Sequence, residues 1–388
     1  MSVLRLHAEG PRVAPFELFF DLVFVFAVTQ LSHLLLEHPT AGGALQTLFL
    51  MLAVWWAWMY TAWTTNFCDP NHPVIRLTLA GLMLASLVMA AAVPEAFGDR
   101  AIWFACAYVA IQIGRTIVVA LLTRGHALQR VFLGVGFWFA LSAVFWIAGA
   151  ILGGTAQAAL WVVALLIDYG APAAGFRTPG LGRSTTTEWT IDGGHMAERC
   201  QLFVIIALGE SILVTGTTLA DAKTDALTFV AFAVCLLGSI AMWWVYFDLT
   251  ADLAAERIES SDDPGRLGRS AYTYMHIPMV AGIIVSAVGD ELVIAHPGGH
   301  SSPWTVLMAL GGPVLYLAGH TMFKRAVFGA LSTGRIVAIG VLCAMVVVGL
   351  LVPAVPPLAL TVVGLLVLAG VAVWDTRVFR HSQAEPVT

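Results

Sequence analysis

Charged side chains are scarce in this chain. Only 11% of its 388 residues are Asp, Glu, Lys or Arg, whereas 59% are hydrophobic, and the mean hydropathy is +0.86. Soluble globular proteins carry about a quarter charged residues, so this composition excludes an ordinary soluble domain. The formal net charge is only -5 and no basic block occurs, which excludes nucleic acid as a partner. We therefore expect an all-α bundle of helices in a membrane, with lipids as its surroundings.

Cysteine is also sparse. The five cysteines are odd in number, lack Cys-x-x-Cys spacing and mostly fall inside apolar runs. This pattern predicts buried free thiols and argues against a disulfide framework or a cysteine-bound metal. The first 15 residues lack the apolar core of a signal peptide, so we expect the first apolar run to be retained.

Long apolar runs are the dominant feature of the sequence. A membrane-spanning helix needs about 20 mostly apolar residues. Twelve stretches meet this requirement, centred near residues 26, 55, 84, 111, 141, 165, 208, 238, 282, 313, 343 and 366. Lys and Arg gather in alternate connections between them, because basic residues accumulate in cytoplasmic loops. The sequence therefore predicts twelve spans with both termini in the cytoplasm.

The two halves of the chain show weak self-similarity. The aligned segments are LVFVFAVTQ at 22–30 with LFVIIALGE at 202–210, and Trp55-Trp56 with Trp243-Trp244. Each half would hold six spans, so we expect a parallel internal repeat, with residues 1–185 as the first six-helix half and 186–388 as the second. Functional groups of such a repeat lie between its halves.

Acids at fixed places in apolar helices carry a family resemblance. The segments are ELFFDLVFVFAVTQLS at 17–32, ERCQLFVIIALGESIL at 198–213, and Trp243-Trp244 with YFD at 246–248. They resemble the bacterial low-temperature-requirement A (LtrA) family from about residue 12 to about residue 375. The resemblance implies a multi-pass protein of the bacterial inner membrane and supplies no mechanism. The family-motif positions that carry over are Glu17, Asp21, Glu198, Arg199, Glu210 and Asp248.

Glu17 and Asp21 lie one helical turn apart in the first apolar run and share a helix face. Glu17 falls in the first turn, where a carboxylate suits the positive end of the helix dipole. Asp21 lies a turn deeper and needs a partner, because an unpaired charge in lipid costs about 3 kcal/mol or more. Arg115 in the fourth span is the candidate cation. We expect Asp21 and Arg115 to approach each other.

Glu198 and Glu210 lie on roughly one face of the seventh span at different depths. They could form steps of a proton path, since a buried carboxyl group can hold and release a proton near neutral pH. Alternatively, Glu198 caps the helix beside Arg199 at the interface, and Glu210 bonds to neighbouring hydroxyl groups. The depth of Glu210, near the midplane, makes it the main functional candidate.

Histidines offer a weaker signal. His276 and His320 are expected near the ends of spans. His195 and Glu198 form an HxxE pair that could bind a metal only if one of those histidines joined them, so no metal is predicted. The acids and histidines of residues 290–300 are interpreted as a solvated loop rather than a cation site.

Aromatic residues crowd the second and eighth spans. Trp55 and Trp56 lie near mid-span, away from the interfaces where Trp usually gathers, and Trp243 and Trp244 are their counterparts. These rings could serve interhelical packing. They could instead form the walls of an apolar cavity for a lipid, an isoprenoid or a cation, the last held by cation–π attraction.

Three functions fit these residues. The leading hypothesis is a transporter of unknown substrate, coupled to protons, with Glu210 carrying the proton, Glu17 and Asp21 as cavity acids and Arg115 as counter-ion. The alternative is a membrane-embedded enzyme that acts on a lipid or isoprenoid by general-acid chemistry at the same carboxyl groups. A sensor or assembly factor with purely structural acids is the third.

The partners expected for the leading hypothesis are membrane lipids and a small-molecule or lipid-like substrate. A homo-oligomer is compatible with the sequence, and any cofactor is left undefined. The predicted substrate-binding residues are Arg115, Trp55, Trp56, Glu198, Trp243, Trp244, Asp248, His276 and His320.

Overall fold

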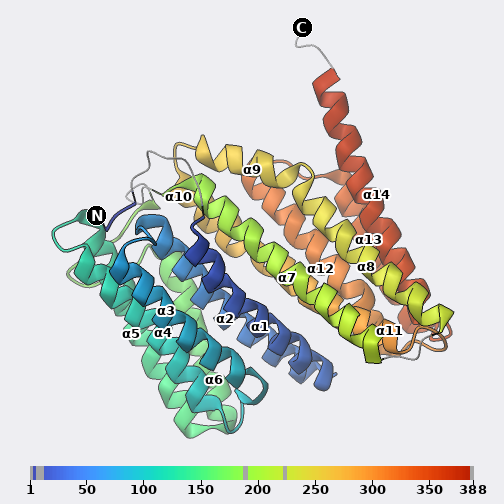
Figure 1. Ribbon diagram of the computed structural model, residues 1–388, viewed down its shortest axis with the longest axis horizontal. Coiled ribbons are helices and arrows are strands. Elements are labelled where there is room, and N and C mark those ends of the chain that lie inside the picture. Colours follow the sequence, from blue (N-terminus) through green and yellow to red (C-terminus); the bar gives the residue numbers. More distant parts are fainter. Residues whose placement is uncertain (1–2, 6–12, 187–190, 222–224, 385–388) are drawn as a thin grey trace. The chain divides into compact units, whose positions relative to one another are not determined.

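The protein is described by a computed structural model covering residues 3–5, 13–186, 191–221 and 225–384. Its described part holds twelve helices that are long and apolar enough to cross a membrane (Figure 1). This confirms the all-α fold and the twelve predicted spans.

Capping residues and glycines mark the ends of the spans. Their bounds are α1 Pro15–Glu37, α2 Ala41–Phe67, α3 Pro73–Ala92, α4 Ala101–Leu122, α5 Ala127–Leu152, α6 Gly154–Ala173, α7 Gly193–Asp221, α8 Ala226–Phe247, α11 His276–Ala295, α12 Pro303–Phe328, α13 Thr333–Leu351 and α14 Pro357–Ala384. At α12, Ser302 caps the first turn by accepting a hydrogen bond from the Thr305 backbone N–H, and Gly329 ends the helix with a φ of 79°.

The long connection before α11 is itself helical. It forms α9, Thr250–Glu259, then α10, Pro264–Leu267, and a π-helical stretch, Gly268–Tyr274, that leads into α11. Asp263 starts α10 by accepting a hydrogen bond from the Arg266 backbone N–H.

The chain divides into two compact units. The first unit comprises residues 1–34, 42–199 and 259–268, and the second comprises 35–41, 200–258 and 269–388. The first unit thus holds most of α1, α2 to α6 and the opening turns of α7. The predicted halves, divided near residue 185, and their internal repeat remain predictions.

Aromatic packing and buried polar groups form the core of the first unit. The Trp146 and Trp161 rings lie 5.1 Å apart, and the Trp161 indole N–H donates to the Trp146 carbonyl. Asp168 accepts hydrogen bonds from the Tyr108 hydroxyl at 2.8 Å and from the Trp146 indole at 3.2 Å. Both donors reach Oδ2, and Oδ1 is buried without a hydrogen-bond partner among the described residues.

Helices α11 and α12 of the second unit pack with their backbones in close approach. An added Cβ at Gly312 would lie 2.6 Å from the backbone nitrogen of Ser286, and one at Gly282 would lie 2.4 Å from that of Tyr316. Such distances require glycine. Small residues allow helix backbones to approach in membranes, where packing and hydrogen bonds replace the hydrophobic driving force.

Candidate functional site

The first unit holds a buried cluster of charged side chains, two from α1 and two from the opening turns of α7. Glu17 and Asp21 are 0% and 1% exposed, and His195 and Arg199 are both 0% exposed. Each pair is separated by one helical turn, so Glu17 meets His195 and Asp21 meets Arg199. We call these four residues the α1–α7 charge cluster.

The order of these contacts fixes the local direction of the two helices. The earlier residue on α1 meets the earlier residue on α7, and the later meets the later. The two helices therefore run in the same direction at this contact, as expected of a first and a seventh span in a chain that crosses the membrane with every helix.

Glu17 binds the beginning of its own helix and the first histidine of α7. Its Oε2 accepts a hydrogen bond from the Ala14 backbone N–H at 2.8 Å, the return contact of a capping box. Its Oε1 lies 2.9 Å from His195 Nε2. Arg5 Nη2 lies 3.7 Å from Oε2, and Arg199 Nη1 lies 3.7 Å from Oε1. Glu17 is thus a helix-start acid, as expected, and also part of an interhelical network.

The tautomer of His195 follows from its neighbours. The Asn66 side chain accepts a hydrogen bond from the Asp192 backbone N–H at 2.9 Å and donates one to the Asp192 carbonyl at 2.8 Å. These two bonds fix the orientation of the amide. The Asn66 NH₂ group therefore faces His195 Nδ1, 3.1 Å away, and Nδ1 must accept. The ring proton is left on Nε2, from which it is donated to Glu17.

One carboxylate oxygen of Asp21 accepts two hydrogen bonds. Arg199 Nη2 and the Trp58 indole N–H both donate to Asp21 Oδ1, each at 2.8 Å. The Arg199 guanidinium carbon lies 5.7 Å from the centre of the Trp58 ring, within cation–π range. Within the described chain, Asp21 Oδ2 and Arg199 Nε are buried without a hydrogen-bond partner. One side of this ion pair is therefore unsatisfied.

The predicted contact between Asp21 and Arg115 is wrong. Arg115 is buried on α4, where it donates to Thr61 Oγ1 at 3.1 Å, to the Ala57 carbonyl at 3.3 Å and to the Gln112 side chain. No ion pair to an acid forms there among the residues the structure describes. Neutral oxygens of α2 and α4 satisfy its guanidinium instead.

The position at which α7 begins explains why Arg199, and not Arg115, is the cation that pairs with Asp21. One prediction made Glu198 a helix cap with Arg199 at the interface, but α7 starts at Gly193. Arg199 consequently lies in the second turn and is buried. Glu198 accepts a hydrogen bond from the Val13 backbone N–H at 3.0 Å and does not cap the helix.

The second unit brings His276 and His320 together around Tyr246. Their rings lie 5.8 Å and 5.9 Å from the Tyr246 ring. His276 Nδ1 lies 3.3 Å from the Ala271 carbonyl, which can only accept, so His276 Nε2 accepts the hydrogen bond from the Tyr246 hydroxyl at 2.8 Å. Both histidines were predicted as binding residues, and that role stays a prediction.

A partly buried ion pair extends from His320 to the last span. Arg335 on α13 bonds to His320 Nδ1 and forms an ion pair with Asp375 on α14. Lys324 Nζ lies 3.6 Å from the same carboxylate. This group was not predicted from the sequence, because Arg335 lies at a span end, where basic residues usually face the cytoplasm. The useful signal was an arginine three residues into an apolar helix together with an acid inside the last span.

The predicted aromatic residues divide between two environments. Trp55 and Trp56 are buried; Trp55 lies 5.1 Å from the Trp58 ring and Trp56 stacks 3.8 Å from the Tyr169 ring. Trp56 thus packs between α2 and α6, whereas the Trp55 contact lies within α2. Trp243 and Trp244 are 45% and 49% exposed, and their role in substrate binding stays a prediction. Trp favours the ends of spans, where it meets the membrane interface.

The remaining predicted residues are also placed. Asp248 follows α8 and accepts a hydrogen bond from Thr376 at 3.0 Å. Glu210 is buried in α7, and its role as a proton carrier stays a prediction. The interpretation of residues 290–300 as a solvated loop is wrong at its start, because α11 extends to Ala295 and Asp290 is buried. The described residues include no group of three or more His, Cys, Asp or Glu that could hold a metal ion.

Twelve apolar helices with buried ion pairs inside them define a polytopic membrane protein. The chain belongs to the family of the bacterial low temperature requirement A protein (LtrA), whose family model matches residues 12–370. It is 37% identical over 368 residues to an uncharacterized protein of Rhizobium meliloti (strain 1021), a match that covers 94% of this chain and 89% of the relative. No solved structure matches the chain significantly. The resemblance is thereby confirmed, and the protein is a multi-pass protein of the bacterial inner membrane.

Proposed function

We propose that the protein is a membrane transporter coupled to protons through the α1–α7 charge cluster. The observation that carries the proposal is the arrangement at Asp21. One carboxylate oxygen accepts from Arg199 and Trp58, while the other, also buried, has no hydrogen-bond partner among the described residues. A proton can bind that second oxygen without displacing a donor. Its binding cancels the charge that faces Arg199, and its release restores the ion pair.

At Asp168 an oxygen also lacks a partner among the described residues, but at Asp21 the incomplete hydrogen bonding lies within a buried ion pair to Arg199, which favours a functional role over a structural one. Charges buried within spans are costly, and a cluster that only stabilises the fold gains from satisfying every buried polar atom. Here the guanidinium Nε of Arg199 and the Oδ2 oxygen of Asp21 lack hydrogen-bond partners within the described chain. A charge cluster that alternates between two protonation states cannot give every polar atom a hydrogen-bond partner in both states.

His195 is the fixed member of the cluster. Its Nδ1 accepts from Asn66 and its Nε2–H donates to Glu17, so both ring nitrogens are engaged in the neutral form. Adding a proton at Nδ1 would place two N–H groups against each other. The carboxyl groups are therefore the proton-exchanging members in this proposal, with Glu210 as a second candidate deeper on α7.

The test uses purified protein in liposomes adsorbed on a solid-supported membrane. An acidic pH jump should displace charge in the native protein, and Asp21→Asn should abolish the transient current. Glu37→Gln removes an exposed carboxylate from the same helix and should leave it intact. An unchanged current in a folded Asp21→Asn variant would contradict the role of Asp21. Solutes can then be screened with a pH-sensitive dye inside the liposomes, and a substrate is a solute that drives proton flux only when Asp21 is present.

The enzyme alternative needs an aromatic cavity that ends at a carboxyl group. Trp58, the indole beside Asp21, already donates to that carboxylate and packs on Arg199. Trp55 and Trp56 pack against other rings. Trp58 thus holds the charge cluster, while Trp55 and Trp56 pack on other rings, and we propose transport alone.

A further inference from the structure

The second unit contains a small cavity in which polar groups from several spans converge. The cavity has a volume of about 20 Å³ and is lined by residues of α8, α11, α12 and α14. Its polar side chains are Ser286 and Asp290 on α11 and Thr361 on α14. All three are buried, with at most 8% exposure. We call this the Asp290 cavity.

Asp290 is an acid without a basic partner. No Lys, Arg or His is among the described residues that line the cavity, and the one ionisable group beside the carboxylate is the Cys235 thiol. Asp290 lies five residues before the end of α11, about 7 Å inside the helix at 1.5 Å per residue. A carboxylate at such depth is stable only when a proton or a bound cation neutralises it.

Two hydroxyl groups present their oxygens as acceptors. The Thr361 hydroxyl donates to the Pro357 carbonyl at 3.2 Å, within its own helix. The Ser286 hydroxyl is directed at the Met242 sulfur, 4.0 Å away. Because each hydroxyl proton is directed elsewhere, the lone pairs of both oxygens remain available to a positive ligand in the cavity.

A backbone carbonyl of α12 completes the set of oxygens. Pro313 lies inside α12 and lines the cavity. It has no N–H, so it cannot donate the helical hydrogen bond to the carbonyl of Ala309, which also lines the cavity. Opposite this carbonyl, an added Cβ at Gly364 would lie 3.8 Å from the Ala309 oxygen. Glycine at this position leaves the oxygen uncovered.

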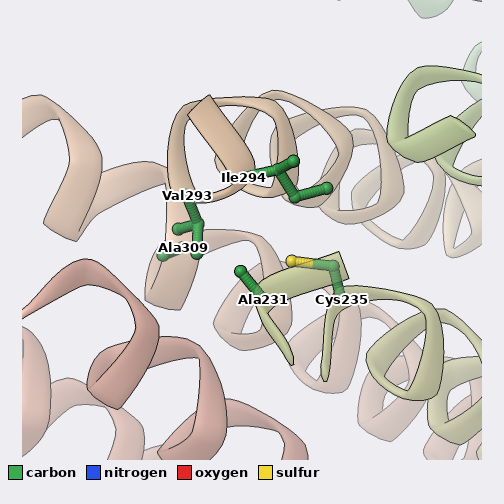
Figure 2. Close-up of a cluster of buried hydrophobic side chains, with 5 residues drawn as sticks. All are labelled: Ala231, Cys235, Val293, Ile294 and Ala309. Carbon is green, nitrogen blue, oxygen red and sulfur yellow. The ribbon is translucent and has the colours of Figure 1, made fainter. Parts of the chain in front are cut away.

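A cluster of buried apolar side chains lies next to Asp290 along α11. Figure 2 shows Val293 and Ile294 of α11, one turn beyond Asp290, packed with side chains of α8 and α12. Cys235 and Ala309 belong both to this cluster and to the surroundings of the carboxylate.

The size and charge of the cavity select the ligand. A carboxylate, two hydroxyls and a carbonyl are oxygen ligands that suit hard cations rather than thiophilic metals. Calcium takes 6 to 8 oxygens, usually from several carboxylates, and magnesium retains much of its water. One carboxylate balances one positive charge, and about 20 Å³ holds a single water-sized occupant. These limits leave a small monovalent cation.

We propose that the Asp290 cavity is a sodium-ion site. Asp290 supplies the charge, the Ser286 and Thr361 hydroxyls and the Ala309 carbonyl supply neutral oxygens, and Pro313 keeps that carbonyl available. Interrupted helices provide carbonyl ligands for sodium in this way in membrane transporters. The site goes beyond the proposed function, since its residues lie in the second unit and its occupancy does not depend on Asp21.

The test measures thermal unfolding of the purified full chain by tryptophan fluorescence, in NaCl, KCl or choline chloride at equal ionic strength. The native protein should show a saturable rise in Tm with Na⁺ that K⁺ and choline do not reproduce. Asp290→Asn should lose this rise. Glu291→Gln, which removes the neighbouring carboxylate on a different face of α11, should retain it, and so should Asp21→Asn.

Two further variants test the sodium site if Asp290→Asn does not fold. Thr361→Val removes one ligand oxygen at constant shape, and Gly364→Ala places a methyl group beside the Ala309 carbonyl without a clash. Each should raise the Na⁺ concentration for half-maximal stabilisation about tenfold or more. Absence of a Na⁺-specific rise in the native protein overturns the proposal, as does its persistence in Asp290→Asn. Stabilisation by acid without any response to Na⁺ would assign the carboxyl group to a proton and overturn it too.

Discussion

Arg199 on α7 donates to Asp21 on α1 at 2.8 Å, and both side chains are shielded from solvent. One turn earlier on each helix, His195 and Glu17 make the equivalent contact at 2.9 Å. The two contacts join the same pair of helices, so a change in the charge of either acid alters the attraction between α1 and α7. This relationship makes the α1–α7 charge cluster both a structural joint and a candidate for proton exchange.

Removing the arginine should destabilise the protein strongly. Arg199→Ala leaves Asp21 buried beside Trp58 without a cation, and loss of one partner from a buried ion pair costs about 3–5 kcal/mol. The measurement is the free energy of unfolding in a denaturing-detergent titration. Arg100→Ala is the control, because it breaks an exposed pair with Glu95 that is expected to contribute about 0–1 kcal/mol. Equal stability of the two variants would contradict the buried pair.

Replacing Asn66 should release the tautomer of His195. Asn66→Leu removes the donor to Nδ1 and leaves both backbone groups of Asp192 without their side-chain partner. We expect a loss of about 1–3 kcal/mol. Nitrogen-15 NMR of labelled histidine should show the Nε2–H tautomer in the native protein and a mixture in the variant. Detection of the Nδ1–H tautomer for His195 in the native protein would disprove the assignment.

The packing of α11 on α12 can be tested with adjacent glycines. At Gly312 an added Cβ meets the Ser286 backbone nitrogen at 2.6 Å, whereas at Gly311 nothing lies within 4 Å. Gly312→Ala should lower stability by about 1–3 kcal/mol through overpacking. Gly311→Ala should be neutral or slightly stabilising, because alanine is the better helix former. The comparison is by thermal unfolding, and equal Tm values would argue against the close approach.

Cys68 should be inert at neutral pH. It directly follows α2, and burial raises the pKa of its thiol from an ordinary value near 9 to about 12. The unfolded thiol ionises first as pH rises, so its contribution to stability is fully present below about pH 9 and is lost progressively towards about pH 12. A variant with Cys68 as its single cysteine should resist iodoacetamide at pH 8 until it is unfolded. Rapid labelling of the folded variant would contradict this burial.

The contact between Cys68 and the N-terminal segment offers a further check on that labelling. Leu4 pairs with Cys68 through an isolated β-bridge. Deleting residues 1–5 should expose the thiol and speed its reaction, whereas the unaltered chain should react slowly. The two measurements together separate shielding by the N-terminal segment from shielding by α2.

Twelve spans could be predicted because apolar length is a local property of the chain. A stretch of about 20 apolar residues has to place its backbone in a helix to cross a bilayer, whatever its neighbours are. The same reasoning placed Glu17 in the first turn of its helix. It failed for Asp290, because a polar residue near the end of an apolar run fits either a buried helix end or a loop.

The partner of Asp21 was decided only by the tertiary structure. Arg115 lies inside one apolar run and Arg199 at the start of another, and nothing in their local sequence says which helix face meets α1. The position of Arg199 depends on α7 starting at Gly193, and the satisfaction of Arg115 depends on Thr61 and Gln112. The sequence by itself thus determined how many helices cross the membrane and which charges they contain. Which charges meet was settled by packing between helices far apart in the chain, because an ion pair depends on faces brought together and not on the residues beside it.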